Sequence, residues 1–178
     1  MAQSHGVSLP LIRTVQRINQ LQPREAIEKL RRLLGSLEDK TIGVLGLSFK
    51  PNSDDMREAS SLSLIRLLEK QGCLIKAYDP LAMPAAANLM PEVAYCADAY
   101  EVAKGSDALI LVTEWDEFKE LDMSMIYSLM NRPIIIDGRN IYDADEMEQA
   151  GFLYEGIGHN GIKHKKLEAA LAGDTKRG

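Results

Sequence analysis

From residue 41 onward the sequence alternates between short apolar runs and segments with helical spacing of apolar residues. The apolar runs are typical of buried strands and read TIGVLGL, CLIKAYDP, EVAYC, DALILVTEW and PIIIDGRN, with GFLYEGIG as a candidate edge strand. The segments SSLSLIRLLEKQG, ADAYEVAKG and MSMIYSLMN have helical spacing, and we expect the first helix to begin at its serines and end at Gly72. Because neighbouring parallel strands need crossovers, this order predicts an α/β fold: a Rossmann-like, open and mainly parallel sheet with helices on both faces.

A helical pattern precedes this alternation. Apolar residues recur at helical spacing over residues 11–34, and Pro23 disturbs the pattern, so the segment is either two helices or one long helix. We therefore divide the chain into a helical segment at 1–38, a nucleotide-binding α/β domain at 39–158 and a polar tail at 159–178. The apolar stripe of the helical segment is larger than the sheet domain can cover, which predicts a partner.

The composition limits the class of protein. A chain of 178 residues with 46% apolar content can bury one sizeable core, and its net charge of -5 argues against nucleic acid as a partner. No apolar run reaches the roughly 18 residues of a membrane span and the N-terminus lacks a secretory signal, so we expect a cytoplasmic protein without a membrane partner. Cys73 and Cys96 have neither metal-binding nor disulfide spacing, and we interpret both as buried structural thiols.

The polar segments that follow the strands are the candidate ligand site. Ligands of open parallel sheets bind outside the carboxyl ends of the strands, where the strand order reverses. Three polar segments follow strands in this sequence: residues 49–57, 113–115 and 137–140. In a doubly wound order the first and fourth strands are neighbours, which would place Lys50 near Thr113. Lys50 and Arg139 would offer positive charge to an anionic group and Phe49 a flat face for a base, so these segments favour a nucleotide.

Each of these residues also has a structural interpretation that the sequence leaves open. Phe49 could belong to the core, and Lys50 could be a solvated surface lysine. Asp54 and Asp55 could favour the N-terminal end of the following helix, and Arg57 could pair with one of them.

The segment after the first strand resembles the start of a dinucleotide-binding loop but lacks its glycine fingerprint. Only Gly43 and Gly46 are present, and their spacing is wrong. Asp79 follows the second strand, where such a fold often has its ribose-binding acid, but Asp-Pro is equally an ordinary start of a turn.

Together these motifs resemble the C-terminal, UDP-binding domain of the UDP-glucose/GDP-mannose dehydrogenase family. The segments GVLGLSFKPNSDDMREASS, AYDP, ALILVTEWDEF, PIIIDGRNIYD and GFLYEGIG follow that family's order and intervals. LIRTVQRINQLQP resembles the end of its central helix, where Asn19 and Gln22 match an Asn-x-x-Gln pattern. The resemblance covers residues 7–159.

The resemblance implies a function. The family oxidises the C6 hydroxyl of a nucleotide sugar to a carboxylate in two NAD-dependent steps, through a thioester on a cysteine, and its C-terminal domain holds the nucleotide. Carried over, Phe49 and Lys50 match the segment that contacts the nucleotide sugar, and Arg139 matches a substrate-binding arginine. Arg57 matches an arginine that reaches NAD. The family dimerises through its central helix, so the resemblance implies a homodimer and a nucleotide sugar, a UDP-sugar before others, as partners.

The family's NAD-binding domain and its cysteine-bearing glycine-rich segment have no counterpart in this sequence. We therefore assign no catalytic residue or metal ligand, expect NAD to be bound mainly by another domain or chain, and expect this chain alone to be inactive. Two hypotheses follow: part of a nucleotide-sugar 6-dehydrogenase, or a stand-alone nucleotide-sugar-binding or assembly module without catalysis. UDP-glucose, UDP-N-acetylhexosamine and GDP-mannose enzymes share these motifs, so the motifs do not identify the sugar.

Overall fold

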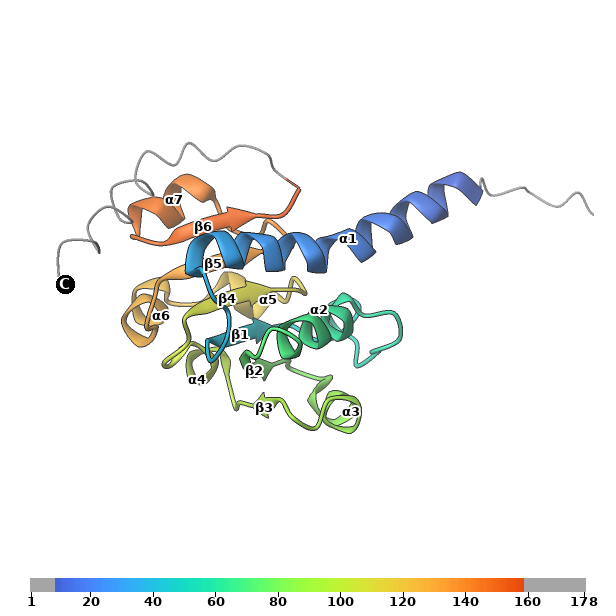
Figure 1. Cartoon of the computed structure of the whole chain (residues 1–178), viewed down its shortest axis with the longest axis horizontal. Coiled ribbons are helices and arrows are strands. Elements are labelled where there is room, and N and C mark those ends of the chain that lie inside the picture. Colours follow the sequence, from blue (N-terminus) through green and yellow to red (C-terminus); the bar gives the residue numbers. More distant parts are fainter. Residues whose placement is uncertain (1–8, 159–178) are drawn as a thin grey trace, which may run out of the picture.

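The computed structural model describes residues 9–158, with side chains from residue 22 onward. Its centre is a six-stranded sheet in the order β3-β2-β1-β4-β5-β6 (Figure 1). The strands are β1 (Thr41–Leu45), β2 (Leu74–Tyr78), β3 (Ala94–Tyr95), β4 (Ala108–Leu111), β5 (Ile134–Asp137) and β6 (Leu153–Gly156). Every neighbouring pair is parallel. The predicted Rossmann-like α/β fold is confirmed, including the edge strand β6.

Of the six helices described after residue 38, three were expected and three were not. The expected helices are α2 (Ser60–Glu69), α4 (Ala99–Ala103) and α6 (Met123–Leu129). No pattern in the sequence predicted α3 (Met83–Leu89), α5 (Asp116–Lys119) or α7 (Ala144–Gln149). The longest of the missed helices has 7 residues, about two turns, which is too short for an apolar period to show.

The helical segment is one helix, α1 (Leu9–Leu34), which continues through Pro23. Its C-terminal half packs on the domain through buried Ala26, Leu30 and Leu33. Farther from the domain, the N-terminal half of α1 projects away from it (Figure 1). None of the described helices, α1 included, is long and apolar enough to cross a membrane.

The sheet is covered on both faces, as its continuous apolar runs predict. One apolar cluster packs α1, α2 and α3 on one face of the sheet. A second cluster packs the helices α4, α5, α6 and α7 on the opposite face. Alternate residues of a strand serve opposite faces, as Ile134 and Ile136 of β5 belong to the first cluster and Ile135 to the second. This packing fixes the strand ends, and with them the loops that carry the candidate site.

A buried charge cluster ties α1 to the edge strand β6. Glu155 is fully buried and pairs with Arg32 and with Lys29, whose Nζ lies 3.3 Å from Oε2 of Glu155. Lys29 also lies 3.3 Å from Glu25. Because breaking a buried pair leaves an uncompensated charge, this cluster fixes where α1 can sit on the sheet. The predicted tail, residues 159–178, lies outside the described residues.

Candidate functional site

The candidate site lies at the carboxyl ends of β1, β4 and β5. β1 and β4 are neighbours, as predicted, and the chain turns from one side of the sheet to the other between them. The segment after β1 touches the segment after β4, because Thr113 Oγ1 donates to the carbonyl of Ser48 at 2.6 Å. We call the three segments 46–59, 112–115 and 138–142 the rim.

The two glycines of the first strand and loop serve packing. Gly46 has φ +86°, and a Cβ there would lie 2.6 Å from Cβ of Thr113. A Cβ on Gly43 would lie 2.4 Å from the side chain of Leu109 and 2.6 Å from that of Val102. Gly46 therefore lets the loop approach the β4 segment, and Gly43 makes room for α4. This explains why their spacing differs from that of a phosphate-binding fingerprint.

Asp79, which directly follows β2, is a structural residue beside the rim. Its side chain is completely buried, which contradicts the ribose-binding interpretation and supports the turn. Oδ1 accepts the N–H groups of Leu81 and Ala82, at 2.9 and 2.7 Å. Oδ2 accepts those of Leu47 and Ser48, at 2.7 and 3.0 Å. Burial alone would raise the pKa of Asp79, but these backbone hydrogen bonds outweigh it and lower the pKa.

The predicted start of α2 at its serines is confirmed, since the helix begins at Ser60, but the capping residue is not a serine. Its N-cap is Ala59, which makes no side-chain capping bond. The serines therefore do not cap the helix. Instead, Ser61 Oγ donates to the carbonyl of Leu47 at 2.5 Å, so this serine fixes the loop after β1. The predicted end of the helix is confirmed, because Gly72 follows α2 with φ +76°.

Phe49 and Lys50 both lie on the surface of the rim. Phe49 is 47% exposed, so the alternative that it belongs to the core is wrong. Its N–H donates to the carbonyl of Asp55 at 2.9 Å, which closes the loop, and Asn52 at its tip has φ +58°. An exposed ring beside an exposed ammonium group is suited to a base and an anionic group, respectively.

Arg139 stands on a turn organised by Asp137, which the sequence analysis did not single out. Asp137 is fully buried, and its Oδ1 accepts the N–H groups of Arg139 and Asn140 at 2.8 and 2.7 Å. Oδ2 accepts the N–H of Ile141 and the hydroxyl of Tyr154, both at 2.8 Å. The available signal was an acid ending an otherwise apolar strand, Ile-Ile-Ile-Asp.

Glu114 is a second residue that the sequence analysis missed. It forms a two-pronged ion pair with Arg139, in which one Nη donates to Oε1 of Glu114 at 2.6 Å and Nε donates to Oε2. Hydrogen bonds from Arg139 hold the pKa of Glu114 below its usual range, against the opposing effect of burial. An arginine has five N–H donors, so donors remain for a ligand. The segment after β4 thus binds the other two segments of the rim. Thr113 bonds to Ser48 on one of them, and Glu114 pairs with Arg139 on the other.

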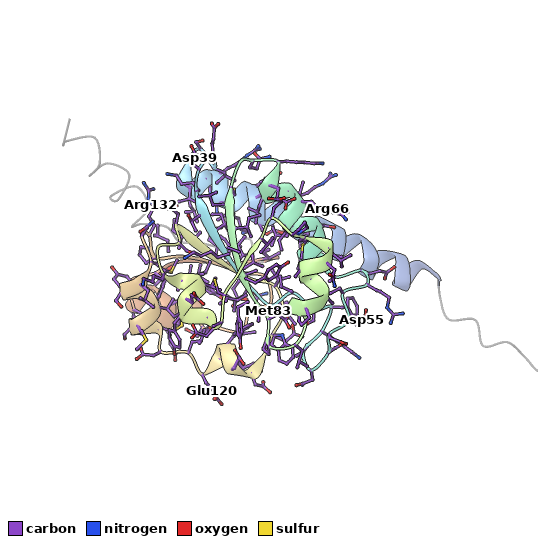
Figure 2. The ribbon with its side chains drawn as sticks, turned by 90° about the horizontal axis from the view of Figure 1, so that it is seen from below. Asp39, Asp55, Arg66, Met83, Glu120 and Arg132 are labelled. Carbon is purple, nitrogen blue, oxygen red and sulfur yellow. The ribbon has the colours of Figure 1, made fainter. Side chains whose placement is uncertain are left out.

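Arg57 lies on the same loop as Phe49, and its side chain is 89% exposed. Its Nε and Nη2 atoms donate to Asp55 at 3.0 and 2.8 Å, so the alternative that Arg57 pairs with a nearby acid is present in the structure. The hydrogen bonds from Arg57 lower the pKa of Asp55 to about 2. Asp55 is on the loop between β1 and α2 at the edge of the domain (Figure 2).

Neither cysteine has the character of a nucleophile. Burial raises the pKa of Cys73 to about 11, and burial also raises the pKa of Cys96. Cys96 is buried and Cys73 is half-buried, with its thiol 3.4 Å from the carbonyl of Leu37. A thiol with a raised pKa carries little thiolate at neutral pH.

Helix α1 reaches the rim at the end of its packed half. A small cavity beside the end of β4 is lined by Gln22 and Ala26 of α1, Ser60 of α2 and Val112. Gln22, matched to the family's Asn-x-x-Gln pattern, therefore lies next to the rim. The side chain of Asn19 lies outside the described side chains.

The fold and the rim define a class of protein: a Rossmann-like α/β domain whose ligand edge carries side chains in place of a glycine-rich phosphate loop. The UDP-binding domain of the UDP-glucose/GDP-mannose dehydrogenase family matches residues 43–144. The chain belongs to this family and corresponds to its UDP-binding part.

Individual relatives agree with this assignment. The UDP-glucose 6-dehydrogenase TuaD of Bacillus subtilis is 39% identical over 164 residues, which cover 92% of this chain and 36% of that protein. The UDP-glucose 6-dehydrogenase of Pseudomonas aeruginosa is 38% identical over 176 residues, 95% of this chain and 39% of that protein. A solved UDP-glucose dehydrogenase from Pyrobaculum islandicum is 33% identical with a TM-score of 0.68, covering 81% of this chain and 31% of that one. The chain thus spans little more than a third of the length of its curated relatives.

Proposed function

We propose that this chain binds the nucleotide end of a UDP-sugar at the rim, as the UDP-binding part of an NAD-dependent nucleotide-sugar 6-dehydrogenase. The observation that carries the proposal is the arrangement of three side chains around the β4 segment. Phe49 and Lys50 are exposed on one neighbouring loop, and Arg139 is held on the other by Glu114. Phe49 would stack on the base, while Lys50 and Arg139 would contact the phosphates.

The chemistry of the proposed reaction needs more than this rim. NAD would accept hydride from the substrate, and we propose that another domain or chain supplies its main binding site and the nucleophilic cysteine. Within this chain the exposed guanidinium of Arg57 fits a contact to the cofactor, because most of its surface is open to a second body. The raised pKa values of Cys73 and Cys96 agree with the proposal that this chain alone is inactive.

The same proposal includes four further points. The chain divides into parts at residues 38 and 158, and it forms a homodimer through α1. It works in the cytoplasm and takes part in polysaccharide biosynthesis. The projecting half of α1 supports the dimer, since it offers a surface beyond the domain's own core (Figure 1). The relatives' printed activity, UDP-glucose 6-dehydrogenase, supports a UDP-sugar as the ligand.

Titration calorimetry of the 178-residue chain tests the proposal. UDP should bind more tightly than uridine, because uridine lacks the phosphates that Lys50 and Arg139 would contact. We expect a dissociation constant between micromolar and millimolar, about -8 to -4 kcal/mol, because only one side of the substrate is held. Equal affinity for UDP and uridine would contradict the proposed placement of the phosphates.

A further inference from the structure

The first four backbone N–H groups after β1 all donate to acceptors within the protein and are not available to a ligand phosphate. In dinucleotide-binding folds the corresponding loop presents its N–H groups to a pyrophosphate. Here the N–H of Gly46 donates to the carbonyl of Tyr78 at 2.9 Å, and that of Phe49 donates to the carbonyl of Asp55 at 2.9 Å. Between them, the N–H groups of Leu47 and Ser48 both donate to Oδ2 of Asp79. Four successive donors are thus bonded within the protein.

The backbone carbonyl groups of residues 47–48 are also hydrogen-bonded within the protein. The carbonyls of Leu47 and Ser48 accept hydroxyls from Ser61 and Thr113, at 2.5 and 2.6 Å. With both of its sides bonded, residues 47–48 have one conformation, and the next residue is Phe49. The direction in which Phe49 and Lys50 leave the loop therefore depends on the group that binds residues 47–48.

That group is a carboxylate with an unusual number of donors. Besides the four backbone N–H groups, Oδ2 of Asp79 accepts Ser48 Oγ at 3.1 Å and the indole Nε1 of Trp115 at 3.2 Å. Six donors converge on one completely buried side chain. An ionised carboxylate offers about four lone-pair sites and no donor, whereas an amide would turn an NH₂ group toward some of these N–H groups. The site is therefore built for a negative charge.

We propose that Asp79 is a positioning residue that acts as an internal anion in the loop after β1. It occupies the N–H groups of Leu47 and Ser48, two of the donors that a dinucleotide phosphate would use, and fixes the loop so that Phe49 and Lys50 face the ligand. The part of this inference that concerns Phe49 and Lys50 rests on the proposed binding of a UDP-sugar at the rim. The chain would thereby read its ligand with side chains and reject a dinucleotide at this loop.

The two oxygens of Asp79 separate this role from simple support of α3. Oδ1 binds only the start of the α3 segment, at Leu81 and Ala82, while Oδ2 binds the loop and Trp115. Asp79→Asn can keep an oxygen toward Leu81 and Ala82 while losing the acceptor on the loop side. If Asp79 served α3 alone, this variant would bind UDP like the wild type.

The first experiment uses the unmodified chain and amide NMR. The amides of Leu47 and Ser48 should exchange slowly with solvent in the free chain, and pyrophosphate or NAD, added separately, should leave that exchange unchanged. UDP should shift the resonances of Phe49 and Lys50. Fast exchange of the Leu47 and Ser48 amides that pyrophosphate slows would overturn the internal-anion role. If UDP shifts no resonance, the proposed function fails, while the pyrophosphate titration still decides the role of Asp79.

The second experiment compares variants. Asp79→Asn should weaken UDP binding by about tenfold or more with the fold retained by circular dichroism, and the emission of Trp115, the chain's single tryptophan, should change. In Asp79→Gly, added formate should restore part of the lost affinity by replacing the carboxylate. Asp107→Asn is the matched control. Asp107 accepts the N–H of Thr41 at 2.9 Å, at the amino ends of the strands and thus away from the rim. Wild-type UDP affinity in folded Asp79→Asn would overturn the positioning role, and if neither variant folds the NMR titrations decide.

Discussion

Asp79 and Asp137 are two residues with the same structural role at the ends of different strands. Each follows the last apolar position of a strand, each is completely buried, and each gathers the N–H groups of a turn. Neither faces the rim's surface. Two side chains do face it: Phe49 follows Ser48, whose N–H is accepted by Asp79, and Arg139 donates its own N–H to Asp137. The rim is therefore built from buried acids that shape the backbone and exposed groups that are left for a ligand.

We expect Arg139→Ala to weaken UDP binding by about 1.5 to 3 kcal/mol, the range for a lost charge-assisted hydrogen bond. The removal also leaves Glu114 unpaired beside the phosphates. Arg57→Ala is the control and should change the affinity by less than about 0.5 kcal/mol, because its proposed partner is the cofactor. Calorimetry that finds equal losses for both arginines would place the phosphates elsewhere.

The lowered pKa of Asp79 predicts a pH dependence of stability. Because the folded pKa lies below the unfolded value, Asp79 stabilises the fold above the unfolded pKa, and this contribution is lost as the pH falls through the folded pKa. The difference in free energy of unfolding between wild type and Asp79→Asn should therefore be constant near neutrality and shrink at acidic pH. Urea denaturation at several pH values measures it. A difference that grows toward acidic pH would mean that the folded pKa is raised instead.

The sequence predicted the candidate ligand-binding residues of the rim better than the residues that hold them in place. Phe49, Lys50 and Arg139 could be placed because each follows a recognisable strand in a known topology. Glu114 could not, since its partner lies 25 positions away on another loop, and only the strand register brings them together. Asp79 stayed ambiguous because an Asp-Pro pair fits a turn and a ribose contact equally well until burial is known.

Elements of sufficient length could be recognised in the sequence, and short ones could not. Helix α2, with 10 residues, has an apolar face that periodicity detects, whereas α5 has 4 residues and no complete period. For α1 the sequence left open one helix or two, because a proline both lacks a donor and crowds the preceding turn. Packing of the residues after Pro23 on the sheet favours continuation.

Helix α1 is expected to be part of the cooperative core. Leu30→Ala should lower the free energy of unfolding by about 2 to 5 kcal/mol, since Leu30 is completely buried between α1 and the sheet. Glu28→Ala, at an exposed position of the same helix, should cost little. Chemical denaturation followed by circular dichroism compares the two. Similar small losses would indicate that α1 folds apart from the domain.

At the scale of the whole molecule, we expect a homodimer. The N-terminal half of α1 projects away from the domain (Figure 1), and its sequence repeats apolar residues at helical spacing, which a second copy could cover. Light scattering at high micromolar concentration should give twice the mass of 19.8 kDa. A monomeric mass under those conditions would contradict a dimer formed through α1.

We also expect the purified chain to be catalytically silent. Mixed with UDP-glucose and NAD, it should produce no NADH absorbance above a blank, because neither cysteine is suited to form a thioester. A full-length UDP-glucose 6-dehydrogenase assayed in parallel provides the positive control. Turnover that persists after repurification would contradict this expectation.

The continuity of α1 through Pro23 has a geometrical consequence. Its 26 residues span about 39 Å, and each residue turns the helix by about 100°. One residue inserted before Gln22 would thus swing the outer surface about a quarter-turn around the helix axis while leaving the rim intact. Seven inserted residues would bring that surface nearly back into phase, about 10 Å farther away. The length of α1 therefore sets the distance at which a second body can approach the rim, and its helical rotation sets the angle of that approach.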